Sequence, residues 1–120
     1  MNKKTLVLGA SLKSNRYSNL AIQKLVKNNV EVVAFGLKSG VVAGVDIQTT
    51  LLQYNDIHTI TLYLNPQRQR EYYEHIVSLR PQRVIFNPGT ENPELYKLLK
   101  ENHIAFDGAC TLVLLSTDQY

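Results

Sequence analysis

The sequence predicts an α/β fold, a doubly wound parallel sheet of about five strands in a three-layer arrangement. Two observations favour it. Short apolar segments rich in β-branched residues alternate with segments whose apolar residues recur at helical spacing. The apolar segments also lack a regular polar alternation, as is typical of strands covered on both faces. A length of 120 residues suits one domain, which we expect to span residues 1–120.

Five segments are expected to form the strands. Each is a short run of mainly apolar residues, and each is followed by Gly, Asn or Asp, which favour turns. Their separation by helical segments favours parallel pairing with right-handed crossovers. The predicted strands cover residues 6–8, 30–35, 59–64, 83–86 and 103–106.

Helices are expected between these strands and after the last one. Ser18 is the predicted N-cap of the first helix, and Pro66 suits the first position of the second. Thr90 or Asn92 is expected to cap the third, whose first turn contains a proline. The predicted helices cover residues 19–28, 67–79, 93–101 and 110–117.

The stretch from residue 36 to residue 55 has no clear period. It contains three glycines, which favour loops. We expect loops here, with a short helical turn over residues 50–54.

Charge and composition restrict the class of ligand. The formal charge of +3 comes from dispersed Lys and Arg, so a nucleic-acid footprint is not expected, and an anionic small molecule fits better. No apolar run approaches the roughly 20 residues of a membrane span. The single cysteine, Cys110, cannot form an internal disulfide, and the first residues lack the apolar stretch of a signal peptide. These features favour the cytoplasm.

The turn after the first strand is the clearest candidate site. Gly9, Ala10 and Ser11 allow close backbone approach, and the following helix would direct its positive dipole end at a bound phosphate. The full dinucleotide fingerprint is absent, since Ser11 stands where a second glycine is expected. A plain strand-to-helix joint remains the alternative interpretation.

The end of the second strand lacks the acidic residue that binds a ribose in nicotinamide enzymes. Gly36, Leu37 and Lys38 stand there instead. Lys38 suits a ligand that bears a phosphate near this strand, although a solvated surface lysine is the alternative.

Several short motifs in succession resemble the small CoA-binding domain family. They are GAS at 9–11, RYSN at 16–19, a return that ends at Gly44, NPGTEN at 87–92 and DGAC at 107–110. That family is a Rossmann-like module related to the CoA-binding domain of the succinyl-CoA synthetase alpha subunit. The resemblance covers almost the entire chain.

The resemblance implies that coenzyme A or an acyl-CoA is the cofactor. Its pyrophosphate would lie at the first turn and the start of the first helix, with Arg16 pairing with a phosphate. Lys38 alone matches the family's Val-Asn-Pro-Lys segment. The residues expected to bind the cofactor are Gly9, Ala10, Ser11, Asn15, Arg16, Tyr17, Ser18, Lys38, Gly89 and Asn92.

No residues group in a way that indicates catalysis or metal binding. His58, His75 and His103 are expected at surface or packing positions. Cys110 matches a cysteine often found near the end of the family's fifth strand, and it is expected either as a small buried residue or as a thiol close to the CoA sulfur.

Three hypotheses follow for the function. The leading one is a protein that binds CoA through the Gly-Ala-Ser turn without catalysis of its own, as a monomer or homodimer. The second is a subunit of a nucleotide- or CoA-using enzyme whose catalytic groups come from a partner chain. The third is an interaction module that has lost the ligand.

Overall fold

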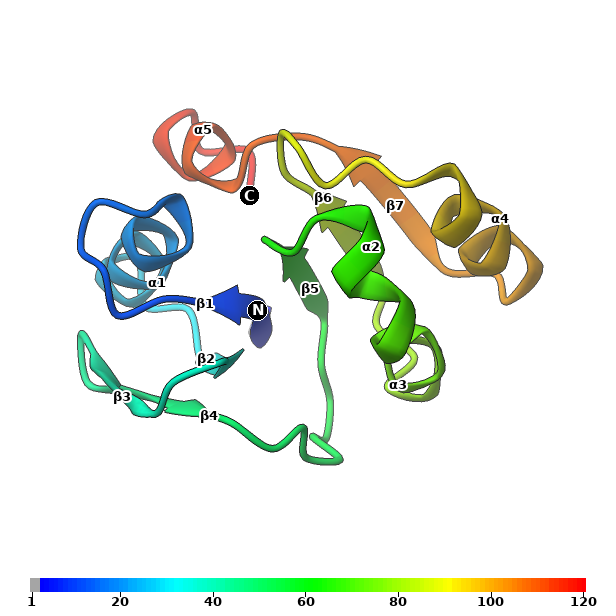
Figure 1. Cartoon of the computed structure of the whole chain (residues 1–120). Coiled ribbons are helices and arrows are strands. Elements are labelled where there is room, and N and C mark those ends of the chain that lie inside the picture. Colours follow the sequence, from blue (N-terminus) through cyan, green and yellow to red (C-terminus); the bar gives the residue numbers. More distant parts are fainter. Residues whose placement is uncertain (1–2) are drawn as a thin grey trace.

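The computed structural model describes residues 3–120, which form one mixed sheet with helices on both faces (Figure 1). The seven strands in this part of the chain lie in the order β3-β4-β2-β1-β5-β6-β7. All neighbours pair in parallel except β3 and β4. The strands are β1 (Thr5–Ala10), β2 (Val32–Gly36), β3 (Gly40–Val42), β4 (Val45–Gln48), β5 (Thr59–Leu62), β6 (Arg83–Phe86) and β7 (Ala105–Gly108).

The doubly wound α/β fold is confirmed, but the expected strand number was too low. The two additional strands, β3 and β4, form an antiparallel hairpin in the segment expected to be loops. Ala43 and Gly44 both have positive φ at its turn, as type I′ hairpin turns require. Strands this short show no readable period. The helical turn expected over residues 50–54 is wrong, because that segment is irregular.

The helices follow the predicted order with two local differences. The helix expected over residues 67–79 is divided into three pieces, and α1 begins before Ser18, which is buried within its first turn. Asn92 rather than Thr90 caps α4, accepting hydrogen bonds from the N–H groups of the first turn. The helices are α1 (Tyr17–Lys27), α2 (Pro66–Gln69), the 3₁₀ turn η1 (Arg70–Tyr72), α3 (Tyr73–Ser78), α4 (Pro93–Glu101) and α5 (Thr111–Ser116).

Two hydrophobic layers cover the two faces of the sheet. On one face, Val7 and Ala34 pack with Ile22 and Leu25 of α1, and α5 adds Leu115. The other face packs against η1, α3 and α4. Alternate residues of β1 pack into the two layers, because successive side chains of a strand point to opposite faces.

The chain changes direction at β1. It proceeds from β1 to β2 on one side and then from β5 to β7 on the other, so β1 and β5 are the neighbours where the strand order reverses. In open α/β sheets, ligands bind outside the carboxyl ends of the strands at such a point. The topology therefore places the candidate site above β1 and β5.

Candidate functional site

A cavity of about 700 Å³ lies at the carboxyl ends of four neighbouring strands. Residues that follow β1, β2, β5 and β6 line it, so its four walls follow the order of the strands in the sheet. Helices from both faces contribute, α1 from one and α2 with η1 from the other. The cavity therefore occupies the crevice that the topology predicts.

The first turn supplies one wall, and its backbone is fixed by local hydrogen bonds. Gly9 has φ +104, and a Cβ there would lie 3.0 Å from the carbonyl carbon of Tyr63. The Ser11 hydroxyl accepts a hydrogen bond from the Lys13 N–H at 3.1 Å, and the Asn19 side chain donates to the Ser11 carbonyl at 2.9 Å. Glycine at this position, with its positive φ, thus allows the backbone just after β5 to pass close by.

The N-terminus of α1 opens on the same cavity. No side chain caps this end of the helix, and its first turn contains no acidic residue. Arg16, Tyr17 and Ser18 line the cavity at this point. The positive end of the helix dipole is therefore directed at the cavity without a resident anion.

The end of β2 has no room for a side chain. A Cβ on Gly36 would lie 2.3 Å from the Ala10 carbonyl oxygen and 3.1 Å from a methyl group of Ile47. Any other residue would force β1 and β2 apart. A ribose-binding carboxylate at this position is therefore sterically excluded.

The charge of the cavity is of one sign. Lys13, Arg16, Lys38 and Arg68 line it, and no acidic residue does. Within residues 3–120, none of these four side chains forms a hydrogen bond or an ion pair. All four are exposed, so their charges remain solvated until a ligand enters. Such a cavity favours a ligand with several negative charges.

Eight of the ten residues expected to bind the cofactor line this cavity, and Asn15 and Asn92 do not. Asn92 is buried behind it, where its side chain caps α4. The cavity is also lined by residues that were not predicted, for which closeness in sequence to the ends of β1 and β5 is the one signal: Lys13, Tyr63, Arg68 and Tyr72. The eight are Gly9, Ala10, Ser11, Arg16, Tyr17, Ser18, Lys38 and Gly89.

A buried glutamine holds the wall that follows β6. The Gln69 amide nitrogen donates to the carbonyl oxygens of Leu64 at 2.8 Å and Thr90 at 2.9 Å. Its amide oxygen accepts a hydrogen bond from Asn92 at 2.8 Å. Gln69 is fully buried, so every polar atom of this side chain is satisfied inside the protein. The segments after β5 and β6 are therefore locked together.

Asn87 makes a second buried connection. Its amide nitrogen donates to the Thr61 hydroxyl at 2.7 Å and the Leu62 carbonyl at 2.8 Å. Its amide oxygen accepts from the Thr111 N–H at 2.9 Å, at the start of α5. This one side chain joins β5, the end of β6 and the start of α5.

Tyr63 and Cys110 differ in their position relative to the cavity. Tyr63 lines the cavity, and burial raises the pKa of its hydroxyl to about 12, so it stays neutral at physiological pH. Cys110 is half-buried at the N-cap position of α5 and is not among the lining residues.

The histidines do not line the cavity. His58 precedes β5, at the amino end of the sheet, where it hydrogen-bonds Thr59. Burial, and then the charges of Arg83 and Lys3, lower the pKa of His58. Within residues 3–120, no group of three or more His, Cys, Asp or Glu side chains could hold a metal ion.

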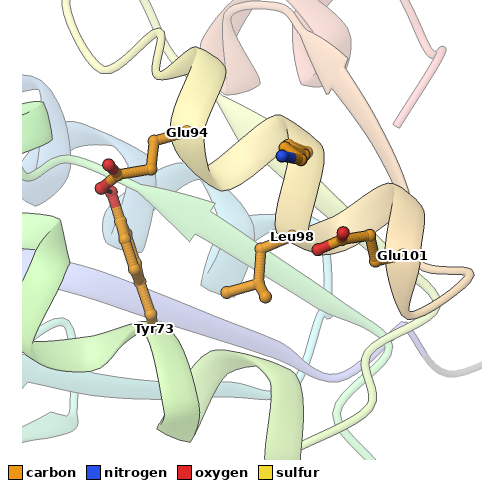
Figure 2. A pocket seen from close by; sticks show the side chains of 5 residues that line it. Tyr73, Glu94, Leu98 and Glu101 are labelled. Atoms are coloured by element: carbon orange, nitrogen blue, oxygen red, sulfur yellow. Dashed lines mark hydrogen bonds between the residues drawn. The ribbon is translucent and has the colours of Figure 1, made fainter.

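A second, smaller cavity of about 310 Å³ lies between α3 and α4 (Figure 2). Tyr73 points toward Glu94 and donates a hydrogen bond to it at 3.0 Å, and Glu101 lies on the same helix as Glu94. Arg70 also forms an ion pair with Glu94, at 3.7 Å. Its lining has two carboxylates and one cation, Lys97, so it suits a phosphate less well than the large cavity does.

Comparison with known proteins assigns the family. The family model described as a CoA binding domain matches residues 3–116, almost the whole chain. The chain belongs to the CoA binding domain family. The resemblance seen in the sequence is thereby confirmed.

Solved structures similar to this CoA binding domain have the same fold. A crystal structure described as that of an uncharacterized protein is 46% identical, with a TM-score of 0.96, and the match covers 100% of this chain and 99% of that one. A hypothetical protein from Pyrococcus horikoshii OT3 is 25% identical, with a TM-score of 0.80 and coverage of 94% and 82%.

A more distant relative of the CoA binding domain shows the fold alone. The cell-free ID.343 protein from Thermus thermophilus is 20% identical, with a TM-score of 0.87 and coverage of 99% and 91%. No curated protein matches the chain. In the part of the chain that the structure describes, no helix has both the length and the apolar character needed to span a membrane.

Proposed function

We propose that this protein binds coenzyme A or an acyl-CoA in the cavity above β1, β2, β5 and β6. The observation that carries the proposal is the charge of the cavity, which has four basic side chains in its lining and no acidic one. CoA has a pyrophosphate and a 3′-phosphate, so its binding would give these basic side chains negatively charged partners. The family membership supports the same ligand.

In this proposal the pyrophosphate binds at the turn after β1. Gly9, Ala10 and Ser11 bring the backbone close to the ligand, and the N-terminus of α1 stabilises its charge. Arg16 pairs with a phosphate oxygen, flanked by Tyr17 and Ser18, which also line the cavity. A guanidinium binds phosphate oxygens with two parallel N–H bonds, which suits this position.

The remaining proposed contacts come from other walls. Lys38 and Gly89 line the cavity at β2 and β6, where they can contact the two ends of the ligand. Asn92 acts indirectly, because its side chain holds Gln69 and the cap of α4.

The exclusion of a carboxylate at Gly36 favours CoA over NAD. A nicotinamide cofactor commonly binds its ribose hydroxyls to an acidic residue at the end of the second strand. Here a Cβ at that position would overlap the Ala10 carbonyl oxygen. Two residues further on, Lys38 places a cation in the lining near the end of β2. In this proposal the protein binds its ligand without catalysis of its own.

A thermal-shift panel with CoA, acetyl-CoA, dephospho-CoA, NAD and ATP tests the proposal. A ligand that binds only the folded state stabilises it by about 2.7 kcal/mol at a concentration one hundred times Kd. We expect CoA and acetyl-CoA to raise Tm and NAD to leave it unchanged. Stabilisation by NAD but not by CoA would overturn the proposal, and no shift with any nucleotide would favour an interaction module.

A further inference from the structure

Arg68 enters the cavity from the face of the sheet opposite α1. It lies in α2, which follows β5, whereas Arg16 precedes α1 on the other face. Both residues line the same cavity, together with Lys38 after β2. The cations therefore approach a ligand from two sides of the sheet rather than from one loop.

Two contacts determine which way this side of α2 faces. Tyr72, four residues after Arg68, packs edge-on against Phe35 of β2, with ring centroids 5.3 Å apart. Arg68 and Tyr72 both line the cavity, so their side chains lie on the same side of this part of the chain. Arg68 and Tyr72 thus face the end of β2, where Lys38 follows Phe35 by three residues.

The hydrogen bonds of Gln69 are consistent with this orientation of Arg68. It is the next residue along the chain, and its side chain bonds the Thr90 carbonyl and Asn92, on the β6 side. Successive helical residues differ by about 100° around the axis, so Arg68 points in a different direction from Gln69. Arg68 is also close enough to Tyr72 that its charge opposes the rise in the pKa of Tyr72 caused by burial and by Glu71.

These observations separate the cations into two groups. Lys13 and Arg16 belong to the turn and the helix after β1, where the pyrophosphate is proposed to bind. Arg68 and Lys38 border the β2 end of the cavity. In doubly wound folds the ribose of a bound nucleotide lies near the end of the second strand, and a cation there accommodates a ribose phosphate.

We propose that Arg68 and Lys38 form a separate subsite for a ribose phosphomonoester, the 3′-phosphate of CoA. This inference rests on the proposed function and assigns Arg68 a role in ligand selection. A phosphomonoester carries about −1.5 to −2 charges at neutral pH and presents three acceptor oxygens. Two cations from different elements can neutralise that charge, and the planar guanidinium of Arg68 suits bidentate binding.

Calorimetric titration with CoA and dephospho-CoA tests the subsite, because the two ligands differ only in the 3′-phosphate. The wild-type protein is expected to bind CoA about ten-fold to a hundred-fold more tightly than dephospho-CoA. Arg68→Gln should remove most of this preference by weakening CoA binding while leaving dephospho-CoA binding unchanged. Lys38→Gln should have the same pattern.

Two matched variants complete the experiment. Arg16→Gln should weaken the binding of both ligands by the same factor, because its proposed partner is the shared pyrophosphate. Arg70→Gln, two residues from Arg68, should alter neither affinity, since its side chain pairs with Glu94 outside the cavity. Arg68 is exposed, so the melting temperature without ligand should be unchanged.

The outcomes distinguish the two proposals. If Arg68→Gln weakens CoA and dephospho-CoA equally, or weakens neither, the 3′-phosphate subsite is overturned while CoA binding itself stands. If the wild-type protein binds neither ligand, the proposed function fails, and the subsite fails with it.

Discussion

The side-chain amides of Gln69 and Asn92 form a buried hydrogen bond of 2.8 Å, although the residues are 23 positions apart. Gln69 also bonds the carbonyl oxygens of Leu64 and Thr90, and both of these residues line the large cavity. The shape of the cavity at β5 and β6 therefore depends on one glutamine that does not itself line it.

Replacing Gln69 by Leu should destabilise the fold. The change leaves the Leu64 and Thr90 carbonyl oxygens without the Gln69 amide, and each unsatisfied buried group costs about 1–3 kcal/mol. The Asn92 amide nitrogen loses one of its two acceptors and keeps the other, the Tyr73 hydroxyl. We expect urea denaturation to show a loss of about 2–5 kcal/mol. Gln67→Leu is the matched control, because Gln67 is exposed in the same helix. Equal stabilities of the two variants would contradict the role given to Gln69.

Gly36→Ala should be strongly destabilising, since its Cβ would lie 2.3 Å from the Ala10 carbonyl oxygen. Overpacking of this kind costs about 1–3 kcal/mol or more. Gly108→Ala is the control, because a Cβ at Gly108 meets no atom within 4 Å. Thermal unfolding of both variants measures the difference. We also expect Gly36→Asp to gain no affinity for NAD. A gain would show that β1 and β2 can move apart with little loss in the free energy of unfolding.

CoA binding should weaken about ten-fold in Arg16→Gln, because a charge-assisted bond to phosphate is lost. The wild-type affinity should also fall as ionic strength rises, since all the cations of the cavity are exposed. Lys97→Gln, on α4 and outside the large cavity, should bind CoA as the wild type does. Titrations at two salt concentrations measure both effects. An unchanged affinity in Arg16→Gln would show that the pyrophosphate does not bind at Arg16.

Tyr63 should make the protein sensitive to alkaline pH. Burial raises the pKa of its hydroxyl from 10.0 to about 12 in the folded protein. The hydroxyl therefore loses its proton at lower pH in the unfolded chain than in the folded protein. The contribution of the Tyr63 hydroxyl to the free energy of unfolding is fully present below pH 10 and is lost as pH rises toward 12. A shift of this size corresponds to about 1–3 kcal/mol.

Tyr63→Phe removes the titrating group and tests this dependence. Its stability should fall less steeply above pH 10 than that of the wild type, as measured by urea denaturation across that range. Tyr17→Phe is the control, because Tyr17 is 69% exposed. Parallel pH profiles for the wild type and Tyr63→Phe would exclude Tyr63 as the source.

Local sequence patterns predicted most of the fold but not the hairpin of β3 and β4 at one edge of the sheet. The segments at β1, β2, β5 and β6 consist mainly of apolar and β-branched residues, whereas β3 has only three residues and β4, VDIQ, includes Asp46 and Gln48. Pairing with β2 stabilises β4, and the hairpin turn then brings β3 alongside it. Such short strands form because of their neighbours in the sheet, so their own residues carry little signal.

The start of α1 illustrates a similar limit. Ser18 is a favourable capping residue, yet Arg16 occupies the cap position and the helix begins at Tyr17. The buried side chain of Asn19 donates a hydrogen bond to the Ser11 carbonyl, which ties the first turn of the helix to the preceding loop. A contact across eight residues thus outweighs the local capping preference.

The sequence by itself determined the doubly wound α/β class, the turn at Gly9 and the family to which the chain belongs. Those features depend on local patterning and on motifs that can be read along the chain. Only the tertiary structure brought Arg68 to the same cavity as Arg16 and Lys38, and gave Gln69 its buried partners. The reason is that these residues approach one another through packing of distant segments against the sheet, which no single stretch of sequence specifies.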